Sequence, residues 1–229
     1  IIVGEALEIS LSGAVIWSSK SRVLKRILEK ELIIGNLDLV TRVVVNEGDF
    51  RGVGQLVKYL PYLIEMRQIP EQDVSELNVF ARFALPKLYD LIRATMNEDT
   101  PKILECVSGL VGLGVGSTPS GDDVIGGFIT SIVFSSMYLG AKYTNLSRIC
   151  DLIPGAIRGR TNEFSEKLIE YAADGEVSEP LRDLVEAVFT STERGTIIEA
   201  TRRVLSIGST SGTDLLLGFL LGLALMLKK

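Results

Sequence analysis

Two short segments of the chain combine glycine, hydroxyl and carboxylate residues in the same order. The first runs from Gly114 to Asp123 and ends Gly-Ser-Thr-Pro-Ser-Gly-Asp-Asp, and the second runs from Gly208 to Asp214 and reads Gly-Ser-Thr-Ser-Gly-Thr-Asp. With one gap they share Gly-Ser-Thr, then Ser-Gly-x-Asp, and then a Gly-Phe pair that begins four residues after the aspartate. We interpret this match as one helix–loop–helix unit that the chain uses twice.

Loops of this composition are suited to binding a small anion. Glycine allows positive φ and a close approach of the backbone to a ligand, and a loop that ends at a helix N-terminus offers free N–H groups and the positive end of the helix dipole. Hydroxyl side chains add donors and can cap the helix. The predicted anion-binding residues are Gly114, Gly116, Thr118, Ser120, Gly121, Ser211 and Gly212, with Asp122 and Thr161 beside them.

The aspartates of these loops have several interpretations. Carboxylates in a first helical turn are stabilising, but Asp122, Asp123 and Asp214 would repel a naked anion. They could orient a substrate amide, grip the opposite loop, hold Mg²⁺, or only cap a buried helix. We assign Asp123 and Asp214 to orienting the substrate amide in the reaction and keep Asp122 and Asp123 as the candidate ligands if Mg²⁺ binds.

A third candidate segment contains two arginines, in Arg158-Gly159-Arg160-Thr161-Asn162. Arginine can grip a carboxylate or a phosphate with two hydrogen bonds, so Arg160 is predicted to neutralise charge on the substrate. The alternative is that both arginines lie on the surface before a helix capped by the residues that follow.

Composition excludes several classes of chemistry. The 229 residues include no histidine and two cysteines, Cys106 and Cys150, which excludes Ser-His-Asp catalysis and the usual zinc sites. Both cysteines occupy apolar positions of helical patterns and are predicted to be reduced core residues. The formal net charge is −5 with no basic stripe, so no nucleic-acid partner is expected. No secretory signal is apparent, and a cytoplasmic protein is predicted.

The elements that must position these loops follow from hydrophobic spacing. Residues 5–17 alternate apolar and polar around a turn at Ser12-Gly13, and residues 31–46 are rich in β-branched side chains; both patterns are typical of strands. We therefore predict an α+β fold, with a small β-rich region at 1–48 and a helical domain at 49–229 that carries both loops. The predicted helical stretches are 21–30, 53–67, 74–95 with an interruption near Pro86, a segment from Thr100, 145–153, 162–173, 180–191, 194–206 and 211–227.

Two apolar segments raise the question of a membrane. Residues 124–141 carry no charge for roughly one membrane thickness, and residues 215–227 contain Gly-x-x-x-Gly at Gly218 and Gly222, a spacing found where membrane helices touch. Both segments open directly on polar loops, and their neighbours are amphipathic in the way of a globular protein. We predict two central helices surrounded by protein rather than membrane spans.

Three blocks of the sequence resemble a known family. Residues 112–123, Gly-Leu-Gly-Val-Gly-Ser-Thr-Pro-Ser-Gly-Asp-Asp, resemble the signature G-L-G-P-G-L-T-P-S-G-D-D of the AllH-type family, with Val115 in place of proline and Ser117 in place of a bulky apolar residue. Residues 161–175 and 208–222 resemble its second and third blocks. The resemblance implies reversible carbamoyl transfer between carbamoyl phosphate and oxamate, performed together with FdrA-type and AllG-type subunits.

Three functional hypotheses follow. The first is a carbamoyltransferase-type subunit that binds a small anion between the two loops. The second is a Mg²⁺-dependent nucleotide- or phosphate-binding enzyme, although the loop lacks the Gly-Lys-Ser/Thr ending of a P-loop. The third is a non-catalytic scaffold subunit whose loops are structural. The expected protein partners are FdrA-type and AllG-type subunits or further copies of the same chain.

Overall fold

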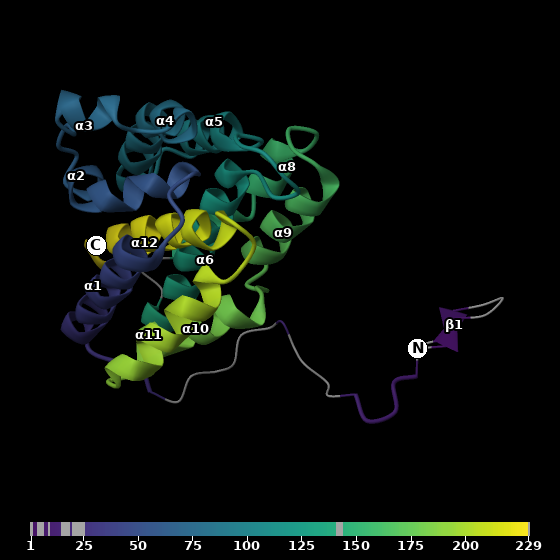
Figure 1. The fold of residues 1–229 in the computed structure, drawn as a ribbon. Coiled ribbons are helices and arrows are strands. Elements are labelled where there is room, and N and C mark those ends of the chain that lie inside the picture. The colour runs from purple at the N-terminus through teal and green to yellow at the C-terminus, as the bar shows by residue number, and fades with distance from the viewer. Residues whose placement is uncertain are drawn as a thin grey trace.

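The computed structural model describes residues 2–3, 7–8, 10–14, 19, 26–140 and 144–228. Helices dominate these residues (Figure 1). The elements are β1 (Ile2–Val3), β2 (Leu7–Glu8), α1 (Lys30–Glu47), the 3₁₀ helix η1 (Val53–Tyr59), α2 (Leu60–Ile64), α3 (Glu71–Ser75), α4 (Val79–Met96), α5 (Thr100–Leu110), α6 (Ser120–Leu139), α7 (Thr144–Cys150), α8 (Ile153–Ile157), α9 (Glu163–Ala173), α10 (Glu179–Thr190), α11 (Arg194–Leu205) and α12 (Ser211–Lys228).

The predicted α+β fold is wrong, because the described part of the chain is a helical structure. β1 and β2 form only a two-residue antiparallel pair, with Ile2 opposite Glu8. The predicted turn at Ser12-Gly13 is present, with Gly13 at φ +79°. The second half of the predicted turn-and-strand unit at 15–17 and residues 21–25 of the predicted helix at 21–30 lie outside the described residues. Residues 26–29 of that predicted helix are described and are not helical, and Lys30 is the first residue of α1.

The largest error concerns residues 31–46, which form helix α1 instead of strands. Ile33, Val40 and Val44 lie on one face of this helix and are fully buried, and α1 packs against α10, α11 and α12. The β-branched residues cost a helix only tenths of a kcal/mol each, whereas burying one large apolar side chain gains about 2 kcal/mol. Tertiary burial therefore decides the conformation of this segment.

Helices α6 and α12 form the centre of the molecule and make the most extensive contact of any two elements (Figure 1). The contact is reciprocal at two glycines. A Cβ atom on Gly127 would lie 1.9 Å from the carbonyl oxygen of Leu215, and one on Gly218 would lie 1.9 Å from that of Val124. No side chain fits at either position, so these glycines set the closeness of the two helix axes.

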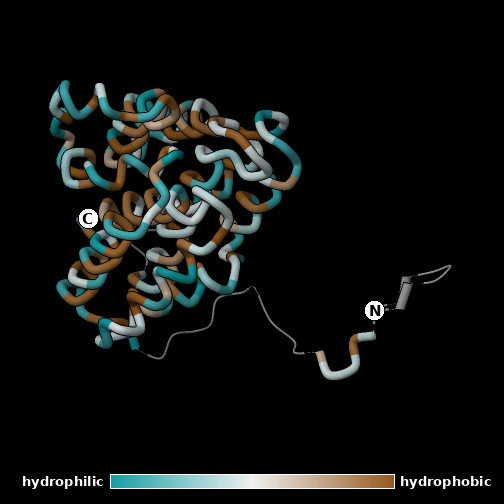
Figure 2. Tube along the Cα trace, in the orientation of Figure 1, coloured by the Kyte–Doolittle hydropathy of each residue, from teal (hydrophilic) through white to brown (hydrophobic). Residues whose placement is uncertain are grey.

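The remaining helices cover this central pair. Helices α4 and α5 lie on one side of it, α1, α10 and α11 lie on the other, and α9 packs along α6 (Figure 1). Hydrophobic residues follow the central helices and polar residues follow the outer turns (Figure 2). Among the described helices, α12 is long and apolar enough to cross a membrane by length and composition alone, but 83% of it is buried inside the structure. Such burial is what a core helix shows.

Most of the other predicted helices are present. The segments predicted at 162–173, 180–191, 194–206 and 211–227 agree with α9 to α12 within two residues at each end. The predicted interruption near Pro86 is absent, since α4 continues through this proline. Helix α5 begins at Thr100 as predicted, and the Asp99 carboxylate caps it by accepting the N–H of Lys102.

Candidate functional site

The two Gly/Ser/Asp loops each lead directly into a central helix. The first loop precedes α6 and has Gly114 and Gly116 at φ +126° and +99°, while the second precedes α12 and has Gly208 at φ +58°. The N–H of Gly121 donates to Leu113 O at 2.8 Å, and the N–H of Gly212 donates to Ile207 O at 3.1 Å. These two amides are already satisfied by their own loops.

The loops touch each other through side chains. The hydroxyl oxygens of Thr118 and Ser211 lie 3.0 Å apart, so the two helix N-termini are brought together although 93 residues separate this pair. A cleft of about 780 Å³ opens beside this contact and runs along α9. Its polar lining includes Ser117, Thr118, Asp122, Asp123, Thr130, Ser165, Glu176 and Ser211, and its apolar lining includes Phe164, Leu168, Ile169, Tyr171, Leu181 and Leu215.

Asp123 lines this cleft and is 9% exposed. Burial raises the pKa of its carboxyl to about 8; a hydrogen bond with Ser211 offsets part of that rise, and the nearby charges of Asp214 and Asp122 add to it. Its Oδ2 is buried without a hydrogen-bond partner among the described residues. At neutral pH the carboxyl therefore carries its proton, and it can donate a hydrogen bond without repelling an anion.

Asp214 is fully buried and does not line the cleft. Burial raises its pKa to about 6, and hydrogen bonds from the Gly54 N–H and from the Ser120 and Thr210 hydroxyls oppose this rise. The Gly54 N–H donates to Asp214 Oδ1 at 2.5 Å. A Cβ atom on Gly52 would lie 2.5–2.7 Å from both carboxylate oxygens of Asp214 and from Ser120 Oγ.

Asp122 acts as a clamp between the first loop and the turn before α9. Its carboxylate accepts the Gly112 N–H at 2.6 Å and also the hydroxyl of Thr161. Asn162 caps α9 by accepting the N–H of Ser165, and its amide donates to Ser117 O at 3.0 Å. The wall of the cleft formed by α9 is thereby fixed to the first loop.

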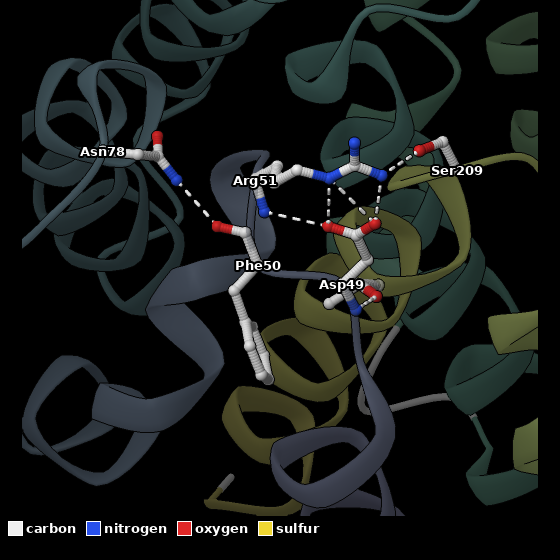
Figure 3. Close-up of polar contacts among 6 residues, drawn as sticks. Asp49, Phe50, Arg51, Asn78 and Ser209 are labelled. Carbon is white, nitrogen blue, oxygen red and sulfur yellow. Dashed lines mark hydrogen bonds and ion pairs between the residues drawn. The ribbon is translucent and has the colours of Figure 1, made fainter.

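A cluster that the sequence analysis did not select covers the second loop (Figure 3). Arg51 forms a two-pronged ion pair with Asp49 and donates to Ser209 Oγ at 2.7 Å. Asn78 holds the same segment by donating to the carbonyl oxygen of Phe50 (Figure 3) and also to that of Gly52. The glycines at 48, 52 and 54 are the sequence signal that marks this segment, because any larger residue there would collide with Thr213 or Asp214.

Comparison with known families identifies the segment that contains both loops. Residues 110–223 match the model of the family described as oxamate carbamoyltransferase subunit AllH. The chain belongs to the AllH family through this segment. The match begins at the last residue of α5 and ends inside α12, so it includes the Thr118–Ser211 contact and the whole of α9. No solved structure matches the chain.

The family description places AllH among the subunits of a carbamoyl-transferring enzyme, which implies that members act together with partner subunits. The matched segment contains the residues selected from the sequence. Of these, Thr118, Asp122, Asp123 and Ser211 line the cleft. Ser120, Gly121, Gly212 and Asp214 are buried around the helix starts, and Gly114 packs on Ser120.

In this AllH-family chain, Arg160 lies outside the cleft. It is exposed, and it is not among the residues that line the cleft. No lysine or arginine occurs in the described lining. Among the described residues no three Asp, Glu or Cys side chains gather closely enough to hold a metal ion. Cys106 and Cys150 are free and buried, and burial raises the pKa of both thiols, which makes them poor nucleophiles.

Proposed function

We propose that this chain is a substrate-binding subunit of a carbamoyltransferase-type enzyme and that a small anion such as carbamoyl phosphate or oxamate binds between its two loops. The observation that carries the proposal is the 3.0 Å contact between Thr118 and Ser211 in the lining of a cleft that also contains buried Asp123. Membership in the AllH family supports the type of reaction.

The donors available to such an anion are mainly hydroxyl groups. The amides of Gly121 and Gly212 are bonded within their loops, so the ligand would meet Ser117, Thr118 and Ser211, with Ser165 on the α9 wall. The N–H groups of residues 114–118 donate no hydrogen bond within the described part of the chain. They form a second set of donors next to the cleft, in a glycine-rich turn of the kind that binds phosphate oxygens.

Asp123 supplies the side chain that can act on the carbamoyl group of the substrate. Transfer of a carbamoyl group requires polarisation of its carbonyl and stabilisation of the leaving phosphate. A protonated Asp123 can donate to the carbonyl oxygen, and its burial keeps the proton in place at neutral pH. The negative charge of the leaving phosphate has no cation opposite it in the described lining of the cleft, so we assign that role to a residue of a partner subunit, of the FdrA or AllG type, or to Arg160 after a rearrangement of its turn.

The proposal can be tested by calorimetric titration of the full chain with carbamoyl phosphate and with oxamate. Replacing Ser211 by alanine removes a cleft hydroxyl and should weaken binding by about tenfold. Ser75→Ala is the matched control, because the Ser75 hydroxyl bonds only within α3 and lies away from both loops. If neither ligand binds, or if both variants bind like the wild type, the two loops do not form the substrate site.

A further inference from the structure

The contact between α6 and α12 has two corresponding halves. Ser120 and Asp123 at the start of α6 correspond to Ser211 and Asp214 at the start of α12, since each pair is the first and last residue of the shared sequence Ser-Gly-x-Asp. In space, the serine of each helix lies beside the aspartate of the other helix. The Ser211 hydroxyl interacts with the Asp123 carboxyl, and the Ser120 hydroxyl interacts with the Asp214 carboxyl. Each half therefore presents one serine from one helix and one aspartate from the other.

One half is filled by the chain itself. The segment from Gly52 to Gly54 lies on the Ser120–Asp214 pair, and the Gly54 N–H donates to Asp214 Oδ1 at 2.5 Å. Gly52 approaches so closely that a single added carbon would stand 2.5 Å from Asp214 Oδ2. What this half binds is thus a peptide group with its N–H directed at the carboxyl oxygen.

The other half faces the cleft. Ser211 and Asp123 both line it. Gly208 packs on Ser211, but no glycine of the described chain lies against Asp123 as Gly52 lies against Asp214. Asp123 is more than nine-tenths buried, and its Oδ2 has no hydrogen-bond partner among the described residues. Asp214 Oδ2 also lacks a hydrogen-bond partner among the described residues, but it lies under Gly52 and outside the cleft. Asp123 lines the cleft, where a ligand can supply the donor that a buried acceptor needs.

We propose that the Ser211–Asp123 half binds the amide N–H group of a primary carboxamide substrate in the way in which the Ser120–Asp214 half binds the N–H of Gly54. This inference rests on the proposed function and specifies which part of the substrate the cleft selects. The amide N–H donates a hydrogen bond to one oxygen of Asp123, and the carboxyl O–H of Asp123 donates one to the amide carbonyl oxygen. Asp214 is in turn a positioning residue that fixes the second loop through residues 52–54.

The test uses two pairs of ligands that differ only in the group that should be recognised. Oxamate and pyruvate have the same charge and nearly the same shape, with an amino group in one and a methyl group in the other. Carbamoyl phosphate and acetyl phosphate form the same kind of pair. Titration of the full chain should show the amide of each pair binding about ten- to a hundredfold more tightly, because its partner would leave Asp123 unpaired.

Three variants separate recognition from folding. Asp123→Ala should remove the preference for the amide, whereas Asp123→Asn should keep part of it, because its side-chain carbonyl still accepts an N–H. Asp214→Asn, in the filled half, should leave the ratio between the paired ligands unchanged. Circular dichroism and urea unfolding of each variant verify that it is folded.

The outcomes distinguish this inference from the proposed function. If oxamate and pyruvate bind equally well and Ser211→Ala weakens both, the loops bind anions but the amide is not recognised. If the amide preference survives in Asp123→Ala, another residue recognises it and the inference is overturned. If none of the four ligands binds the wild type, the proposed function fails as well.

Discussion

The half of the site around Asp214 and the half around Asp123 use the same residue types but meet different neighbours. Asp214 is covered by residues 52–54 and accepts a backbone N–H, and its pKa is raised to about 6. Asp123 borders the cleft and lacks a backbone donor, and its pKa is raised to about 8. The comparison shows that the same buried residue type meets the backbone of the chain in one half and a cleft in the other.

The largest expected effect comes from a glycine of the filled half. Gly52→Ala would place a carbon 2.5–2.7 Å from the Asp214 carboxylate and Ser120 Oγ, and the free energy of unfolding should fall by about 3 kcal/mol. Gly126→Ala is the matched change in the cleft-facing half, where no atom lies within 4 Å of the added carbon. It should raise stability by about 0.5–1 kcal/mol, because alanine favours a helix interior. Urea unfolding measures both, and equal effects would contradict the difference between the halves.

The next effect is a dependence of stability on pH. An aspartate with a raised pKa holds its proton in the folded state at pH values where the unfolded chain has released it, so the stability it contributes is complete below about pH 4 and is lost as pH rises toward 8. Between pH 5 and pH 8 the wild type should lose about 2–3 kcal/mol more than Asp123→Asn. Urea unfolding at both values measures the difference.

Asp214→Asn provides the comparison for this pH effect. The pKa of Asp214 rises only to about 6, so its contribution is lost between about pH 4 and pH 6. The difference in the free energy of unfolding between the variant and the wild type should change in that lower range and then stay nearly constant up to pH 8. A similar pH dependence for both variants would mean that the two carboxyls have similar surroundings.

A smaller effect is expected where the loops touch. Thr118→Val removes the hydroxyl that contacts Ser211 at 3.0 Å but keeps the shape of the side chain, and stability should fall by about 1 kcal/mol. The control is Thr41→Val, because the hydroxyl of Thr41 bonds within α1 to Leu37 O. A loss for the control as large as that for Thr118→Val would show that the contact between the loops adds nothing specific.

The smallest effect belongs to the surface of the filled half. Arg51 joins Asp49 to Ser209 (Figure 3), but its side chain is 75% exposed and water competes for both partners. Arg51→Ala should leave the urea midpoint unchanged within error. A clear loss of stability would mean that this exposed ion pair, rather than Gly52 and Gly54, holds the segment on Asp214.

Much of the candidate site could be predicted from the sequence because its signals are local. The cap residues, glycines and apolar spacing lie within a few positions of one another. They mark the start of α12 at Ser211 correctly, whereas α6 begins at Ser120, four residues before the predicted apolar segment. The same local signals misled at residues 31–46, where a run of β-branched residues suggested strands and burial of Val40 and Val44 produced a helix.

The chain sequence alone determined the two matching loops, the helices that follow them and the membership in the AllH family. Only the tertiary structure decided that Thr118 contacts Ser211, and that residues 52–54 cover Asp214 while Asp123 faces a cleft. The physical reason is distance along the chain. Gly54 and Asp214 are 160 residues apart, and the spacing of side chains encodes which face of a helix is buried but not which distant segment buries it.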